Sequence, residues 1–211
     1  MLKEQDTAER LLQQQTHALQ ERVKELSLIY DLSQLADQTD LALETYFSLV
    51  AARLPAGWQY PEDTCAQLRF DEHAFSTPDF IATPWQQSSP LIINNEPRGE
   101  VLVGYRSEHA PDAEGPFLAE ERNLINEVAR AISRVIERRL RETERQQIEA
   151  AIHRSEGNLK RAQSIAHIGS WHLDITTGDV QCSDELSHIF EISPGSINQL
   201  DGFVKFIHPD D

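Results

Sequence analysis

At 211 residues, the chain has room for one or two domains. Its 35 acidic and 19 basic residues give a formal charge of −16 at pH 7, which repels nucleic-acid phosphates and anionic lipid head groups, so we expect no nucleic-acid partner. Because no run of about 18 apolar residues occurs and residues 1–6 lack the apolar stretch of a signal peptide, we expect no membrane insertion and a cytoplasmic location.

Residues 1–36 contain neither proline nor glycine and are predicted to form one long helix, of which residues 1–30 are a coiled-coil segment. Leucines recur every seven residues and two further apolar residues stand at the intervening positions, which is typical of a heptad seam. The members of this seam are Leu12, Leu19, Val23, Leu26 and Tyr30. Two interpretations fit the pattern: a parallel dimeric coiled coil, or an amphipathic helix packed on its own domain.

Residues 37–40 are predicted to break the chain and to provide the N-cap of a second helix, which ends against Pro55. The apolar face of that helix consists of Leu43, Tyr46, Phe47, Val50 and Leu54. Alternating residues then predict strands at 66–70 and 73–76, and a second hairpin with strands at 91–93 and 101–105. Such short strands need helices on at least one face, so the fold class is α+β with a small antiparallel sheet.

Residues 117–164 are predicted to be helical almost throughout, with Gly157 as a weak point. A helix of this length spans about 70 Å and must extend beyond one small domain. The residues that face the domain are expected to be Leu124, Val128, Ala131 and Val135. Further along, Ile148, Ile152 and Leu159 repeat at spacings of four and seven, whereas Leu140 precedes Ile148 by eight residues. This irregular step predicts a phase slip of the kind that locally unwinds a coiled coil.

After the long helix, residues 168–175 alternate like a strand, 176–179 form a turn, and 180–182 pair back. Ser183 is predicted to cap a short helix that carries Leu186, Ile189 and Phe190.

Two ordered sets of residues resemble known modules. Residues 31–138 resemble a compact GAF-like domain found upstream of PAS and kinase domains in bacterial sensor proteins. The matching residues are Trp58 to Pro61, Thr64 to Ala66, Phe75, Thr77, Phe80, Thr83 to Trp85, Gln87, Ser88, Gly99 to Val101, Tyr105, Gly115 to Leu118, and Glu121 to Ile125.

Residues 165–211 resemble the first half of a PAS domain. The matching residues are Ile168 to Trp171, Asp174, Gly178, Ser183 to Leu186, Ile189, Phe190 and His208 to Asp211, preceded by Ser155 and Glu156 in the linker helix at 139–164. In that family a helix and three strands follow the His-Pro-Asp-Asp element, so we expect this chain to be a fragment of a longer protein. The resemblance implies a sensory and signal-relay segment, most simply of a sensor histidine kinase with its output domain further along the same chain. Alternatives are the input segment of a diguanylate cyclase or phosphodiesterase, and a dimerisation scaffold that senses nothing.

The expected relay is a change of helix packing in a homodimer held by the N-terminal and linker helices. The residues predicted to form its seam are Ile136, Leu140, Ile148, Ile152 and Leu159. No catalytic residue, metal site or cofactor is expected. The cofactor-binding residues, if any exist, are not identified by the sequence.

Several residues that suggest chemistry have simpler interpretations. His153 lacks the acidic neighbour of a phosphoacceptor box, and His167 and His172 have no cysteine beside them. Trp58 and Trp85 could line a ligand pocket, but they are expected to close a small core. Cys65 and Cys182 are expected to be reduced thiols.

Overall fold

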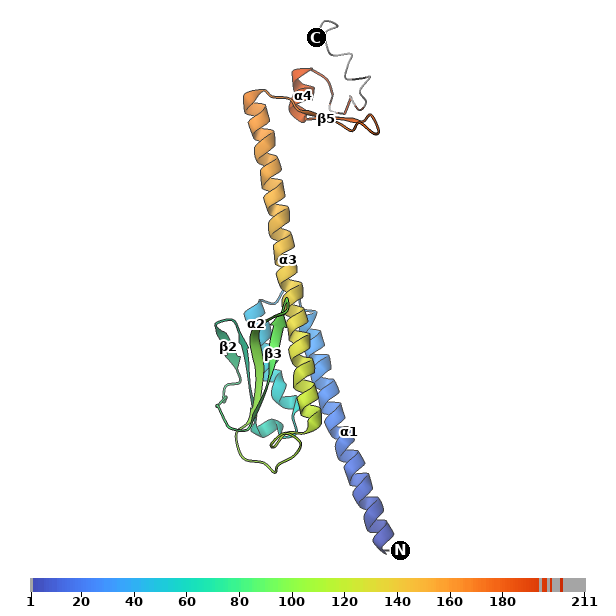
Figure 1. The fold of residues 1–211 in the computed structure, drawn as a ribbon, viewed down its shortest axis with the longest axis vertical. Coiled ribbons are helices and arrows are strands. Elements are labelled where there is room, and N and C mark those ends of the chain that lie inside the picture. The colour runs from blue at the N-terminus through green and yellow to red at the C-terminus, as the bar shows by residue number, and fades with distance from the viewer. Residues whose placement is uncertain (1, 194, 197, 199–201, 203–211) are drawn as a thin grey trace. The chain divides into compact units, whose positions relative to one another are not determined.

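The computed structural model describes residues 2–193, 195, 196, 198 and 202, with side chains from Leu12 onward except those of residues 13, 14 and 17 (Figure 1). Residues 203–211, which carry the His-Pro-Asp-Asp match, lie outside this part. The chain divides into two compact units, Met1–Arg141 and Glu142–Asp211. Its mixture of helices and antiparallel strands confirms the α+β class.

Three helices contribute to the first unit: α1 (Leu2–Ala36), α2 (Leu43–Arg53) and the first half of α3 (Ala119–Ala166). Two short 3₁₀ helices, η1 (Leu54–Gly57) and η2 (Pro61–Asp63), follow α2. The N-cap predicted within residues 37–40 is wrong, because Ala42 holds that position without a side-chain capping bond. Residues 37–41 instead continue the end of α1 as turns: the amides of Asp37 and Gln38 donate to carbonyls of α1.

The sheet of the first unit is antiparallel with strand order β2-β1-β4-β3. Its strands are β1 (Thr64–Phe70), β2 (His73–Ser76), β3 (Gln86–Ile93) and β4 (Glu96–Tyr105). Asn94 and Asn95 join β3 to β4 with φ of 51° and 67°, the conformation of the tight turns that match the twist of a hairpin. Both predicted hairpins are confirmed, and the strands of the second are longer than predicted.

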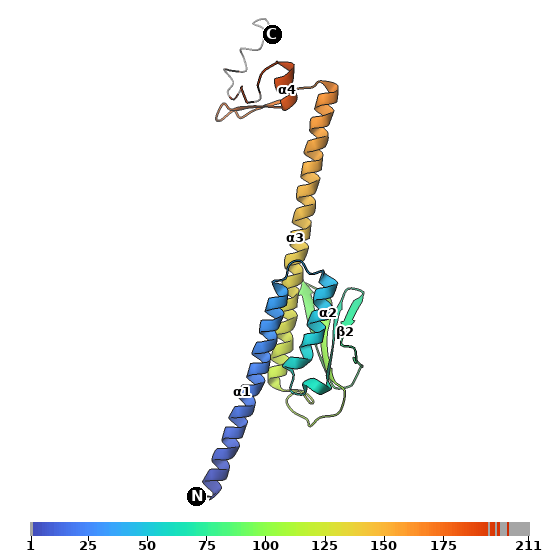
Figure 2. The same ribbon diagram turned by 180° about the vertical axis from the view of Figure 1, so that it is seen from behind.

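The core of the first unit lies between one face of the sheet and the three helices (Figures 1 and 2). Alternate residues of β1, β3 and β4 point into it, and α1, α2 and α3 each contribute a buried row. Its largest fully buried side chains include Trp58, Tyr46, Tyr105, Phe47 and Phe117. The opposite face of the sheet carries the ion pair of Arg69 with Glu100. The helices therefore cover one face, which is the minimum that such short strands require.

Helix α3 continues without interruption through Gly157, so the predicted long helix is confirmed. Its buried residues run from Glu121 to Ile136 and include the predicted Leu124, Val128 and Val135, while Ala131 is half-buried.

The second unit contains the end of α3, the hairpin of β5 (Trp171–Leu173) with β6 (Val180–Cys182), and α4 (Asp184–Ile189). Ser183 caps α4 as predicted, because its hydroxyl accepts from the amide of Leu186. A β-carbon added at Gly169 would lie 2.8 Å from the Leu186 Cα atom, so only glycine permits this close approach. Two hydrogen bonds join Ser170 and Ser183. The Ser183 amide donates to the Ser170 carbonyl at 2.8 Å, and the Ser170 amide donates to the Ser183 hydroxyl at 2.9 Å. The two motifs that suggested a PAS half-domain therefore contact each other.

Candidate functional site

Helix α1 presents two apolar faces. Leu28, Leu32 and Leu35 are buried in the core of the first unit. The five residues predicted as a heptad seam, which we call the α1 stripe, are instead 57–67% exposed. They are Leu12, Leu19, Val23, Leu26 and Tyr30. Nine residues at about 100° each place Leu28 about half a turn from Leu19, so the two faces are opposite. The helix does pack on its own domain, as one interpretation held, and this packing leaves the predicted seam uncovered.

Grooves border the α1 stripe. A groove of about 690 Å³ lies between α1 and the start of α3, where Leu19 and Arg22 face Leu118 and Glu120. Leu26 lines two further hollows, one shared with Ile29 and α3 and one shared with Val23 and Tyr30. An exposed apolar ridge with a hollow on each side has the shape that helix packing requires, because the ridge of one helix fits the groove of another.

Two arginines of α3 fix the end of α1. Arg138 donates to the carbonyl of Ala36, the last residue of α1. Arg139 donates to the carbonyls of Gln38 and Leu41, and its guanidinium lies 5.2 Å from the ring centroid of Tyr46. These contacts satisfy carbonyls that a helix end leaves free, and they tie α1 and α2 to α3.

The predicted relay seam on α3 divides into two sets. Ile136 is fully buried in the core of the first unit, so it supports the domain and is not available to a partner. Leu140 is partly exposed, and Ile148, Ile152 and Leu159 are between 52% and 59% exposed. On an ideal helix the last three lie within about 40° of one another, whereas Leu140 is about 80° away from Ile148. We call Ile148, Ile152 and Leu159 the α3 stripe.

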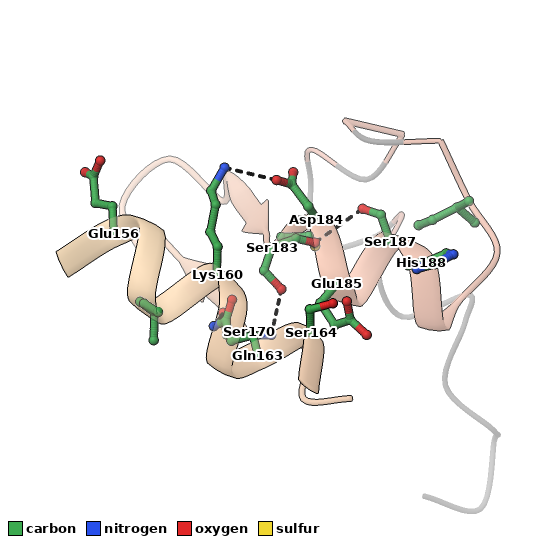
Figure 3. Close-up of a pocket in the computed structure, with 13 residues that line it drawn as sticks. Glu156, Lys160, Gln163, Ser164, Ser170, Ser183, Asp184, Glu185, Ser187 and His188 are labelled. Carbon is green, nitrogen blue, oxygen red and sulfur yellow. Dashed lines mark hydrogen bonds and ion pairs between the residues drawn. The ribbon is translucent and has the colours of Figure 1, made fainter. Parts of the chain in front are cut away.

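A groove that the sequence did not predict occurs in the second unit (Figure 3). It encloses about 790 Å³ between the end of α3 and α4, and Leu159 of the α3 stripe is part of its wall. Lys160 Nζ lies 3.0 Å from Asp184 Oδ2, and Gln163 Nε2 donates to the Ser170 hydroxyl at 2.9 Å. The Lys160–Asp184 ion pair is largely exposed, so it contributes little to stability.

A buried carboxylate that the sequence did not indicate belongs to Glu121. Its side chain is 3% exposed. Glu121 Oε1 accepts from the backbone amide of Gln59 and from the Tyr105 hydroxyl, both at 2.7 Å. Glu121 Oε2 accepts from the backbone amide of Leu118 at 2.8 Å. Its partners are up to 62 residues away in sequence, so no local pattern could have indicated them.

The residues that suggested chemistry are dispersed. Trp58 is fully buried, and Trp85 packs at the edge of the same core. The buried Cys65 thiol lies 3.6 Å from the Ile81 carbonyl, while His153 is exposed beside Glu156. Within the described residues, no group of three or more His, Cys, Asp or Glu side chains is placed to hold a metal ion.

Comparison with known proteins found no matching family model, no matching curated protein and no matching solved structure. In the part of the chain that the structure describes, no helix is both long enough and apolar enough to cross a bilayer. The function must therefore be inferred from the surfaces of the chain itself, of which the two stripes are the most distinctive.

Proposed function

We propose that this chain is a sensory and signal-relay segment of a bacterial signal-transduction protein, and that two copies associate in parallel through the α1 and α3 stripes. The observation that carries the proposal is the second apolar face of α1. That face lies opposite the one buried in the core, it has heptad spacing, and grooves border it. A contiguous exposed apolar row of this kind is a mark of an interaction site.

The two modules are proposed to be a GAF-like domain and the first half of a PAS domain. A small antiparallel sheet with helices on one face supports the first assignment. The contacts of Gly169 with Leu186 and of Ser170 with Ser183 support the second, because they give a structural role to the residues that carry the resemblance. Neither module is proposed to be an enzyme or to carry a cofactor.

The relay is proposed to operate through the packing of α3. A helix that continues from a domain into a following segment can transmit a rotation or register shift, and two packing states that differ by a few kcal/mol suffice for a switch. Because Ile136 belongs to the core, it is removed from the proposed relay seam. The seam then consists of the α3 stripe, with Leu140 at its edge. A sensor histidine kinase is the favoured parent. A diguanylate cyclase or phosphodiesterase is the alternative.

The competing proposal is a scaffold that dimerises without relaying a signal. The scaffold requires association through the α1 stripe, but it does not require that α3 keep a particular rotational phase. The two proposals therefore predict different results when the phase of α3 is changed.

Association is tested by sedimentation equilibrium over a range of concentrations. The wild-type chain is expected to be dimeric at tens of micromolar, and replacing both Leu19 and Leu26 with Asp should weaken the dimer at least tenfold because each dimer would bury four carboxylates. The matched control is Gln20→Asp, an exposed position of α1 outside the stripe, which should leave the dimer intact. A monomeric wild type would contradict the proposal, and so would a double variant that associates as tightly as the control.

A further inference from the structure

The heptad positions of the α3 stripe continue toward the N-terminus of α3 with arginine in place of isoleucine and leucine. Arg141 precedes Ile148 by seven residues, and Arg145 precedes Ile152 by seven. Residues seven apart keep the same position in a heptad repeat, so both arginines stand in line with the stripe. Both side chains are exposed, and α3 is uninterrupted between them and the stripe. An association through this face would therefore bring arginines as well as apolar side chains to a partner.

Within one copy, the contacts of these arginines are local and exposed. Arg145 bonds to Glu142 and Glu149 of the same helix, and the three side chains are 50–60% exposed. Arg141 donates to a backbone carbonyl one turn earlier. In the described part of the chain, no carboxylate pairs with Arg141 and no cation pairs with Glu144. Because exposed pairs along one helix contribute little to stability, a partner can replace these contacts at small cost.

Glutamates occupy the positions that border this seam. Because four residues separate Ile148 from Ile152, Ile148 is a d residue and Ile152 an a residue of the heptad. Glu142 and Glu149 are then e residues, and Glu144 is a g residue. The e and g residues lie on the two sides of a coiled-coil seam, where salt bridges between helices set partner choice and orientation. The positive charge of the seam is thus bordered by negative charge on both sides.

A parallel second copy of α3 presents matching charges. Each seam residue inserts among four residues of the facing helix. For an a residue these include the g residue just before the matching a position, and for a d residue they include the e residue just after the matching d position. Arg145 would lie beside Glu144 of the second copy, and Arg141 beside Glu142 of the second copy. Two arginines among three glutamates give no excess of positive charge, so the surface fits this mixed pattern and not a nucleic acid or an anionic membrane.

The same charges exclude a slipped pairing. If one copy moved by one heptad, Arg145 would enter the space between Ile148 and Ile152 of the second copy and lose its glutamate. A charge that is surrounded by apolar side chains and has no partner is costly to bury. A single polar residue at a seam position can specify register and oligomer state in this way, at some cost in stability.

We propose that residues 141–149 of α3, which we call the charged segment, are a recognition surface for a second copy of this chain. The arginines of one copy pair with Glu142 and Glu144 of the other, and this pairing selects the partner and fixes the parallel register. This recognition rests on the proposed dimer and adds a determinant of specificity to it. The two apolar stripes provide the area of contact, and the charged segment rejects chains whose charges do not match.

Two charge-reversed variants of the full chain test the recognition. The acidic variant carries Arg141→Glu and Arg145→Glu, and the basic variant carries Glu142→Lys and Glu144→Lys. Both also carry Ile152→Cys as the cross-linking site, with Cys182→Ser. The two variants are mixed in a glutathione redox buffer, and mass spectrometry measures the proportions of the disulfide-linked dimers. Mixed dimers should exceed the proportion for random pairing by about tenfold, because each variant paired with itself places like charges together.

The matched control for the acidic variant is Arg154→Glu with Arg161→Glu. It makes the same change in net charge at exposed positions on the side of α3 away from the stripe. Mixed with the basic variant, the control should give an excess of mixed dimers that is about fivefold smaller. An equal excess would show that net charge alone directs pairing and would overturn the recognition. Random pairing of the two seam variants, with a wild type that stays dimeric in sedimentation, would overturn the recognition and leave the dimer standing, whereas a monomeric wild type would remove both.

Discussion

Leu28 of α1 packs directly over Gly57 of η1. A β-carbon added at Gly57 would lie 2.5 Å from Leu28 Cδ2 and 3.1 Å from Leu124 Cδ2 of α3, which is closer than carbon atoms approach without displacement. Gly57 is buried, so it is the point at which α1, α3 and the 3₁₀ turn meet within the first unit.

Gly57→Ala should therefore lower the free energy of unfolding by about 1–3 kcal/mol, the usual cost of overpacking a core. The methyl group can be accommodated only if Leu28 and Leu124 shift. Urea unfolding followed by far-ultraviolet circular dichroism measures the change. Gly157→Ala is the contrasting control: nothing lies within 4 Å of its added β-carbon, and a mid-helix alanine should stabilise α3 by about 0.5–1 kcal/mol. Equal stability of Gly57→Ala and wild type would contradict the packing.

Arg139→Met should destabilise the first unit by about 1–3 kcal/mol. The methionine keeps much of the aliphatic stem but removes the donors to the Gln38 and Leu41 carbonyls and the cation over Tyr46. Arg141→Met is the matched control, since within the described part of the chain the Arg141 side chain bonds only to the carbonyl of Glu137 in its own helix. Thermal unfolding of the two variants compares them, and a loss as large for Arg141→Met as for Arg139→Met would rule out a specific role for Arg139.

The sequence predicted the elements well because their signals are local. Alternation over 66–70 and the Ser183 cap each depend on neighbouring residues, and each is confirmed. The N-cap of α2 was misplaced because Arg139, a residue about a hundred positions away, binds the carbonyls of residues 38 and 41. Tertiary contacts of this kind override local capping preference.

The candidate surfaces were predicted only in part. Heptad spacing identified the α1 stripe but not the separate face that buries Leu28 and Leu32. One helix carries both apolar rows, and the heptad pattern of the exposed row was the only one recognised. Ile136 was assigned to the relay seam although it completes the core row of α3. The buried Glu121 carboxylate was missed for another reason: the groups that donate hydrogen bonds to it belong to Gln59, Tyr105 and Leu118, and only folding brings them together.

Asp63→Asn should destabilise the first unit at neutral pH and make its stability less dependent on pH in the acid range. Burial opposes the shift, but hydrogen bonds from Ser107 and His109 outweigh it and hold the pKa of Asp63 below its ordinary value. A lowered folded pKa means that the ionised group stabilises the fold above its unfolded pKa, and that this stability is lost as the pH falls through the folded pKa. The variant lacks this charge, so the wild type should be the more stable protein above about pH 5, and its advantage over the variant should shrink mainly between about pH 5 and pH 2. Acid unfolding followed by tryptophan fluorescence measures the difference, and superimposable acid profiles would contradict the assignment.

Single cysteines test which faces of the two helices meet in the proposed dimer. Cysteines at Leu26 and Ile152, with Cys182 replaced by Ser, should each cross-link two copies under mild oxidation because seam residues of a parallel dimer face their own counterparts. Gln20 and Ala150 are exposed positions outside the stripes, and cysteines there should cross-link at least fivefold more slowly. Equal rates at Ile152 and Ala150 would show that α3 has no defined seam.

The last prediction separates relay from scaffold by changing the phase of α3. One alanine inserted after Arg145 rotates the following residues by about 100°, whereas seven inserted residues return them to within about 20° of the original face. If both stripes belong to one continuous interface, the single insertion should slow cross-linking of the cysteine at Ile152 at least fivefold and leave that at Leu26 unchanged. The seven-residue insertion should restore the rate at Ile152. Cross-linking at Ile152 that ignores insertion length would mean that the two stripes pair independently, so α3 could not carry a rotation from one unit to the next and the scaffold proposal would replace the relay.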